Sequence, residues 1–201
     1  MAEKERIVRA AYNKIAREYQ ADRGIFDHTE ELEELVSLLP RNARVLDVGC
    51  GAGVPVTGFL VKAGFDVVGI DFSESMLGLA RKNAPQAQLI MGSMTKLGFR
   101  ENSFDGLTAF YSIIHVPREK HLALFQSFHR ILKPKGVMLI CMGTDEWEAV
   151  EEYYGTRMFW SHYSPEISLE LVKNSAFQII FDRHILTGGE RHYWILARDT
   201  K

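Results

Sequence analysis

The chain has 201 residues, 46% of them hydrophobic and 25% charged, with a net charge of −2. This length predicts one domain with a substantial core, and the lack of a basic run disfavours nucleic acid as the main partner. No apolar run approaches the ~18 residues of a membrane-spanning helix, and the two cysteines are too few for a disulfide framework. We therefore expect a reduced, cytoplasmic protein without a stable membrane anchor, acting as a monomer or homodimer.

The first 40 residues predict two amphipathic helices. Apolar residues recur at helical spacing from Ile7 to Tyr19 and again from Leu32 to Leu39, and Pro40 ends the second helix. After them, short apolar runs alternate with helical patterns as far as residue 143. We expect strands over residues 44–48, 65–71, 87–92, 103–112 and 136–143, and helices over residues 54–62, 74–83 and 116–136.

The last quarter of the chain has a different pattern. Residues 145–164 are rich in aromatic side chains and less regular, and residues 164–177 predict another helix. Two further strands, over 177–186 and 191–199, meet around Gly188 and Gly189, which is a hairpin signal. The pattern therefore predicts an α/β fold: a doubly wound, Rossmann-like sheet of seven mostly parallel strands, with an antiparallel last strand.

A glycine-rich turn, "RVLDVGCGAGVP" at residues 44–55, follows the first strand. Ligands of such sheets bind at the carboxyl ends of the strands, and glycines there let a ligand approach the backbone. Asp71 ends the second strand, eighteen residues after Gly53, where a carboxylate can accept hydrogen bonds from both hydroxyls of a ribose. Its alternative role is to cap the helix that begins near Ser73.

Two details of this turn indicate which nucleotide it holds. The dinucleotide pattern G-x-G-x-x-G fails because Val54 stands where the last glycine belongs, which disfavours a nicotinamide-dependent reductase. Asp47 precedes the glycines, and an anion there is a poor neighbour for a pyrophosphate. It suits a ligand that has a positive centre and an amino group, as S-adenosylmethionine does.

Four motifs in order along the chain carry a family resemblance. "VLDVGCGAGVP", "VVGIDFSESML", "GSMTKLGFRENSFDGLTAFYSIIHV" and "ILKPKGVMLI" resemble the successive motifs of class I S-adenosylmethionine-dependent methyltransferases. The match covers roughly residues 12–142. Within this family, the sequence most resembles the small-molecule type, which includes the ubiquinone-pathway methyltransferases. "YNKIAREYQADR" resembles the lid helix that precedes the core in that group. The resemblance implies S-adenosylmethionine as cofactor and S-adenosylhomocysteine as product.

The resemblance also implies a role for each matching residue. The turn would line the methionyl end of the cofactor, Asp71 would hold the ribose, and lid side chains would contact the cofactor carboxylate. Ser93 stands where many members have an acid that accepts from the adenine amino group; serine can accept one hydrogen bond but without that charge assistance. The implied cofactor-binding residues are Tyr19, Arg23, Asp47, Gly49, Cys50, Gly51, Gly53, Asp71, Phe72, Met76, Gly92, Ser93, Met94, Phe110 and Tyr111.

His115 is the candidate general base, because it follows the fourth strand and an unperturbed histidine titrates near neutrality. Its alternative role is to pack at the strand end and orient the loop. Candidate acceptor-binding residues are Tyr12, Trp160, His162 and Tyr163, whose alternative role is simple hydrophobic packing. No cluster of acids, histidines and cysteines has metal-ligand spacing, so we expect no metal site.

The sequence thus predicts methyl transfer to a small molecule by in-line displacement. One alternative is a methyltransferase for a quinone or lipid-like substrate, and another is a cofactor-binding protein without transferase activity. The sequence does not indicate the acceptor atom. We expect one methyltransferase domain over residues 1–201, with lid helices in 1–40, the cofactor-binding core in 41–143, and an acceptor-side cover with the C-terminal hairpin in 144–201.

Overall fold

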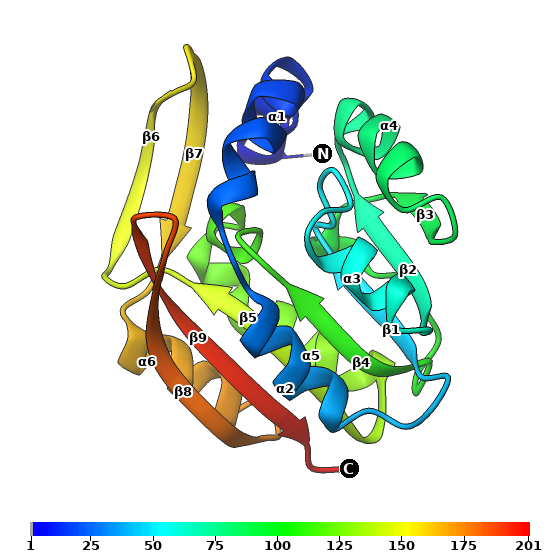
Figure 1. Ribbon diagram of the computed structural model, residues 1–201. Coiled ribbons are helices and arrows are strands. Elements are labelled where there is room, and N and C mark those ends of the chain that lie inside the picture. Colours follow the sequence, from blue (N-terminus) through cyan, green and yellow to red (C-terminus); the bar gives the residue numbers. More distant parts are fainter. Residues whose placement is uncertain (1) are drawn as a thin grey trace.

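A seven-stranded sheet forms the centre of the computed structural model, which describes residues 2–201 (Figure 1). The strand order is β3-β2-β1-β4-β5-β9-β8. Strands β1 to β5 are parallel, and β9 is antiparallel to both of its neighbours. This confirms the predicted sheet, with the antiparallel last strand inside it and β8 at its edge. The strands are β1 (Arg44–Val48), β2 (Asp66–Asp71), β3 (Gln88–Met91), β4 (Phe104–Ala109), β5 (Leu132–Met142), β8 (Phe177–Thr187) and β9 (Glu190–Asp199).

Helices cover both faces of this sheet because alternate strand residues point to opposite sides. Leu46 and Val48 pack in one core layer, whereas Val45 packs in the other. The first layer includes helices α5 and α6, and the second includes α2 and α3. The helices are α1 (Glu3–Asp22), α2 (Thr29–Ser37), α3 (Val56–Lys62), α4 (Glu74–Asn83), α5 (His121–Ile131) and α6 (Pro165–Lys173). The short 3₁₀ turns are η1 (Arg23–Ile25), η2 (Met94–Lys96), η3 (Ile113–His115) and η4 (Arg118–Lys120).

The aromatic-rich segment after β5 is regular, contrary to the sequence prediction. It forms an antiparallel hairpin of β6 (Trp147–Tyr153) and β7 (Thr156–His162), separate from the main sheet, so the described chain has nine strands. Met158 and Phe159 are neighbours in β7, yet both are fully buried. Because both faces of β7 are covered at this point, the strand lacks the alternation of polar and apolar residues that would have identified it.

The predicted helix over residues 116–136 is also shorter in the structure. Helix α5 ends at Ile131, and Leu132 already pairs with Phe104 in the sheet. Leu122, which the helical pattern places on the apolar face, is 38% exposed. Strand β5 begins at Leu132, before Pro134, which the sequence pattern placed at the end of the helix. The pairing of β4 and β5 shifts register between Phe104 and Gly106, so this first part of β5 is irregular.

Helix α1 lies across the top of the molecule in Figure 1, between α4 and the β6–β7 hairpin. Val8, Ala11 and Ile15 of α1 pack against Met158 and Phe159 of the hairpin. The two elements therefore form one cover above the carboxyl ends of the parallel strands. Across residues 2–201, no helix combines the length and apolar character needed to span a bilayer.

Candidate active site

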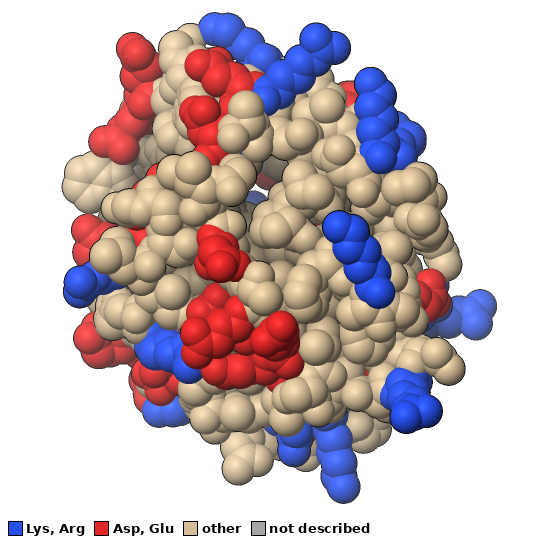
Figure 2. Space-filling model, viewed as in Figure 1, with Lys and Arg blue, Asp and Glu red and all other residues tan. Residues whose placement is uncertain are grey.

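Three adjoining cavities lie under this cover. Figure 2 shows a hollow in this face of the molecule, near the place that α1 occupies in Figure 1. The central cavity, of about 710 Å³, extends from the glycine turn past Asp71 to Ser93. The turn cavity, of about 570 Å³, lies on the other side of the turn, between Asp47 and Arg23. The lid cavity, of about 500 Å³, is bounded by Tyr12, Arg23 and residues of both late hairpins.

The glycine turn lines both the central and the turn cavity. Gly51 has a φ of +52°, and a Cβ built on it would meet no atom within 4 Å, so this glycine faces open space. Gly53 has a φ of +77°, and its Cβ would lie 3.1 Å from the backbone of Ala80, so this glycine lets α4 pack closely against the turn. Gly51 therefore leaves room for a ligand, whereas Gly53 allows close packing.

Asp71 accepts two backbone hydrogen bonds and also faces the central cavity. Its Oδ1 accepts from the backbone N–H of Ser73, the N-cap residue of α4, at 2.8 Å, and its Oδ2 accepts from the N–H of Gly51 at 3.0 Å. The carboxylate also lines the central cavity. Burial raises the pKa of Asp71 to about 6, despite the hydrogen bonds that favour the charged form. Each oxygen keeps a lone pair for a ligand hydroxyl.

Asp47 is held away from solvent by two threonines. Its Oδ2 accepts from Thr57 Oγ1 at 2.6 Å and its Oδ1 from Thr108 Oγ1 at 2.9 Å, so the carboxylate ties α3 and β4 to the end of β1. Burial raises the pKa of Asp47 to about 6. Because Asp47 lines the turn cavity, its negative charge there favours a cationic ligand group such as an ammonium.

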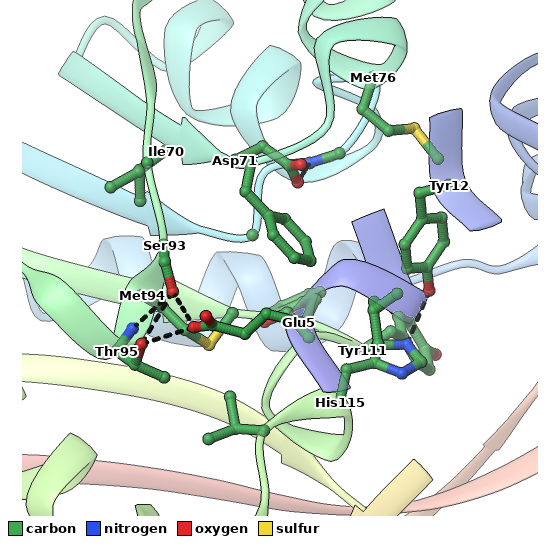
Figure 3. Close-up of a pocket in the computed structure, with 18 of the residues that line it drawn as sticks. Glu5, Tyr12, Ile70, Asp71, Met76, Ser93, Met94, Thr95, Tyr111 and His115 are labelled. Carbon is green, nitrogen blue, oxygen red and sulfur yellow. Dashed lines mark hydrogen bonds between the residues drawn. The ribbon is translucent and has the colours of Figure 1, made fainter. Parts of the chain in front are cut away.

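Ser93 contacts a carboxylate from a distant part of the chain. The hydroxyls of Ser93 and Thr95 donate to Oε1 of Glu5 at 2.7 and 2.8 Å, and Glu5 belongs to the first turn of α1 (Figure 3). All three residues line the central cavity. No local pattern could have joined Glu5 to Ser93, because 88 positions separate them along the chain.

His115 is fully engaged by its neighbours. Its Nδ1 lies 2.8 Å from the carbonyl oxygen of Phe159, which can only accept, so Nδ1 carries the proton. The Tyr12 hydroxyl lies 2.8 Å from Nε2 and therefore donates to it (Figure 3). Burial lowers the pKa of His115 to about 4, so the imidazole is neutral at pH 7.

Arg23 lies between the turn cavity and the lid cavity and lines both. It donates to Glu190 Oε2 and to the Tyr153 hydroxyl, each at 3.2 Å, and its guanidinium lies 4.8 Å from the ring centre of Tyr19. Cation–π contact and two hydrogen bonds thus fix the group in a mostly buried position. The remaining N–H donors of Arg23 are available to an anionic ligand group.

Tyr111 holds a strained position at the end of β4. Its φ is +53°, in the left-handed region that residues other than glycine seldom adopt. The hydroxyl of Tyr111 hydrogen-bonds to Nε2 of His28 at 2.9 Å, and this buried histidine lines the turn cavity. Such strain often accompanies functional sites, and here it holds the tyrosine ring where all three cavities meet.

The structure brings most of the predicted site residues together. Gly53 lies in the turn behind the cavities, His162 hydrogen-bonds to the Asp145 carbonyl, and Tyr163 packs near Arg118 and His121, so these three do not line the cavities. Those at the cavities are Tyr12, Tyr19, Arg23, Asp47, Gly49, Cys50, Gly51, Asp71, Phe72, Met76, Gly92, Ser93, Met94, Phe110, Tyr111, His115 and Trp160.

Several cavity residues have no counterpart in the sequence prediction. Glu5, His28, Tyr153, Glu190 and His192 come from the N-terminal segment and from the two late hairpins. In the sequence, Tyr153 lies in the aromatic-rich run over residues 145–164, and Glu190 and His192 follow the double glycine that predicts a hairpin. Among residues 2–201, no group of three or more metal-ligating side chains is arranged to hold an ion.

These cavities fit S-adenosylmethionine. Asp71 offers acceptors for a ribose, Gly51 leaves a cradle that a Cβ would fill, and Asp47 supplies negative charge at the turn. Ile70, Phe72 and Met94 give the central cavity apolar walls that suit a purine.

A methyltransferase-domain family model matches residues 45–136. The chain is 33% identical to an uncharacterized methyltransferase of Synechocystis sp. over 170 residues, which are 81% of this chain and 78% of that protein. It is 29% identical to demethylmenaquinone methyltransferase of Bacillus licheniformis, covering 72% of this chain and 66% of the relative. A sterol 24-C-methyltransferase of Gibberella zeae is 30% identical over 66% of this chain, which spans only 34% of that enzyme.

A solved structure supports the same fold. Magnesium protoporphyrin IX methyltransferase from Synechocystis PCC 6803 superposes with a TM-score of 0.74 at 18% identity, covering 99% of this chain and 98% of that one. The sequence relatives, the order of the strands and the glycine turn with Asp71 all agree. The chain therefore belongs to the class I S-adenosylmethionine-dependent methyltransferases.

Proposed function

We propose that this protein transfers the methyl group of S-adenosylmethionine to a compact polar or aromatic molecule bound in the lid cavity. The observation that carries this proposal is the junction of the cavities: the lid cavity shares Tyr12, Tyr19, Tyr111 and His115 with the central cavity. A cofactor in the central cavity and an acceptor in the lid cavity would therefore be direct neighbours. Such positioning is the main contribution that a protein can make when the donor is already activated.

In this proposal Asp71 accepts from the ribose hydroxyls, and the turn from Gly49 to Gly51 contacts the methionyl end. Arg23 and Tyr19 complete that end from the lid. The methyl group of S-adenosylmethionine is bound to a sulfonium sulfur, which is a good leaving group. Tyr111, Tyr12 and His115 stand where the methyl group would meet its acceptor, and their side chains exclude water and fix the line of attack.

The state of His115 bears on the acceptor. A buried imidazole whose pKa is about 4 is a weak base, and its Nε2 already accepts from Tyr12. We therefore propose that the acceptor attacks with a lone pair that is free at neutral pH, and that any proton on the attacking atom is released to solvent after the methyl transfer. The Tyr12–His115 pair then acts mainly by holding the acceptor in line.

The alternative of a quinone or lipid-like acceptor draws support from two relatives, whose names refer to demethylmenaquinone and sterol. The side chains of this lid cavity favour a polar acceptor, because burying Arg23 and Glu190 against an aliphatic chain would leave charge poorly solvated. A cofactor-binding protein without transferase activity needs no second cavity, and the presence of the lid cavity favours an enzyme.

Acceptor screening tests this proposal. The protein is incubated with S-adenosylmethionine and panels of small aromatic amines, phenols and aromatic carboxylates, with a detergent-solubilised quinone as comparison, and S-adenosylhomocysteine is quantified. Trp160 lines the lid cavity and not the central cavity, although its ring packs on His115, so Trp160→Ala is expected to raise KM for the acceptor much more than it weakens cofactor affinity. Turnover with the quinone alone would overturn the polar acceptor.

The division of the chain into functional parts is a further proposal. We propose one functional unit, in which residues 1–40 act as lid helices, 41–143 as the cofactor core and 144–201 as the acceptor-side cover. The packing of α1 on the β6–β7 hairpin supports this division, because it joins lid and cover. A cytoplasmic monomer or homodimer that acts without nucleic acid is consistent with the net charge of −2.

A further inference from the structure

The central cavity has two carboxylates in its wall, Asp71 and Glu5. They belong to different parts of the molecule: Asp71 ends β2, whereas Glu5 reaches in from the first turn of α1. In Figure 3 the Glu5 carboxylate is turned towards Ser93 and Thr95, and Asp71 lies apart from it, next to the glycine turn. If Asp71 holds the ribose, as in the proposed function, Glu5 faces the base.

Three donors hold the Glu5 carboxylate in place. Oε1 accepts from the hydroxyls of Ser93 and Thr95, at 2.7 and 2.8 Å, and Oε2 accepts from the backbone N–H of Ala2 at 3.0 Å. Burial alone would raise the pKa of Glu5, but these hydrogen bonds outweigh it and hold that pKa below its ordinary value. A carboxylate offers about four acceptor positions, so one position on Oε2 remains for a ligand.

The surroundings of Glu5 define what that ligand group must be. Ile70, Phe72 and Met94 line the same cavity with apolar surface that suits a planar base. A fixed negative charge beside such a surface favours a base that carries a hydrogen-bond donor and disfavours one that carries a carbonyl oxygen. Adenine has an exocyclic amino group, whereas hypoxanthine has a carbonyl at the same position.

We propose that Glu5 recognises the amino group of adenine, so that lid helix α1 supplies the acidic contact that Ser93 cannot make. The inference rests on the proposed placement of the cofactor in the central cavity. Ser93 and Thr95 are then positioning residues, because their hydroxyls aim the carboxylate. Base recognition and closure of the lid become a single event, since the residue that recognises the base lies on the helix that covers the cavity.

Two ligands separate this role from a structural one. Calorimetry compares S-adenosylhomocysteine with S-inosylhomocysteine, which differs in having a carbonyl oxygen in place of the amino group. The wild-type protein is expected to prefer the adenosyl ligand, and Glu5→Gln to reduce that preference about 10- to 100-fold, because the carboxamide can donate to the carbonyl. Glu3→Gln is the matched control: Glu3 is an exposed acid of the same helical turn and does not line the cavity.

A second variant, Thr95→Val, keeps the side-chain shape but removes one hydroxyl from Glu5, and it is expected to reduce the preference in the same direction by a smaller factor. If Glu5→Gln weakens both ligands equally, or if neither variant changes the preference, Glu5 only anchors the helix and the inference is overturned. If the wild-type protein binds neither ligand, it is instead the proposed cofactor placement that fails.

Discussion

The Tyr12 hydroxyl donates to His115 Nε2 at 2.8 Å, so the lone pair of the unprotonated ring nitrogen is taken up by a side chain of α1. We predict that Tyr12→Phe and His115→Asn each lower kcat about tenfold, and that the double variant is no worse than either, because the two side chains act as one unit. Steady-state formation of S-adenosylhomocysteine measures this. Tyr193→Phe, which removes a hydroxyl bonded to Asp182 on β8, is the control.

A different outcome would identify His115 as the base itself. Direct proton abstraction contributes about 10²- to 10⁴-fold to a rate, so His115→Asn would then be far more damaging than Tyr12→Phe. Independent, multiplying effects of the two substitutions would equally contradict the paired role.

Asp71 gives a second prediction, for the pH dependence of cofactor affinity. Burial raises its pKa to about 6, and the charged form is the better acceptor for ribose hydroxyls. Affinity for S-adenosylmethionine is therefore expected to be constant above pH 7 and to fall about tenfold between pH 7 and 5, as the carboxylate takes up a proton. Calorimetry across this range measures the slope.

Asp71→Asn is expected to bind the cofactor about 10- to 100-fold more weakly at pH 7.5 and to lose most of the slope. Asp47→Asn serves as the comparison, because the pKa of Asp47 is also raised to about 6 and its charge favours a cationic ligand group, but its oxygens already accept from two threonines, so it is expected to remove the smaller part of the slope. If the pH slope persists in Asp71→Asn and vanishes in Asp47→Asn, the titrating group is Asp47, and the prediction for Asp71 is wrong.

The contrast between Asp71 and Glu5 shows what the sequence could predict. Asp71 is recognisable because a strand, a turn and an acid follow one another at fixed spacing, and the sheet then fixes where the carboxylate lies. Glu5 depends on how α1 docks across the sheet, which involves contacts over 88 positions and leaves no local pattern. Tyr153 and Glu190 could not be predicted for the same reason, because their hairpins reach the lid cavity only through tertiary packing.

The glycine turn provides a third prediction. Gly51→Ala is expected to weaken cofactor affinity about tenfold or more, because its methyl group would project into the open space of the cradle. An alanine at this positive φ also adds strain of about 1 kcal/mol to the folded state, which glycine does not have. Gly64→Ala is the matched control, since Gly64 has a φ of +87° and an open surrounding at the end of α3. Equal affinity losses in both variants would show that backbone strain, not the methyl group, is responsible.

Buried histidines make the stability of the fold sensitive to acid. Burial lowers the pKa values of four of them to about 4, from an unfolded value near 6.5. Between pH 6.5 and 4 the unfolded chain therefore binds more protons at these sites, and stability falls as the pH falls. Asp47 and Asp71, whose pKa values are raised to about 6, and Glu31, whose pKa is also raised by burial, act in the opposite sense but are fewer than the histidines. The four histidines are His28, His115, His121 and His192.

His121 isolates this effect because it lies outside the cavities, buried in α5 with its Nε2 bonded to the Val116 carbonyl. We predict that the free energy of unfolding, from urea titrations, decreases between pH 6.5 and 4.5, and that His121→Gln reduces the slope by about 1.4 kcal/mol per pH unit. Leu124→Ala, on the same helix, is expected to cost about 2–5 kcal/mol at every pH without changing the slope. An unchanged slope in His121→Gln would mean that this imidazole is protonated in the folded state as readily as in the unfolded chain.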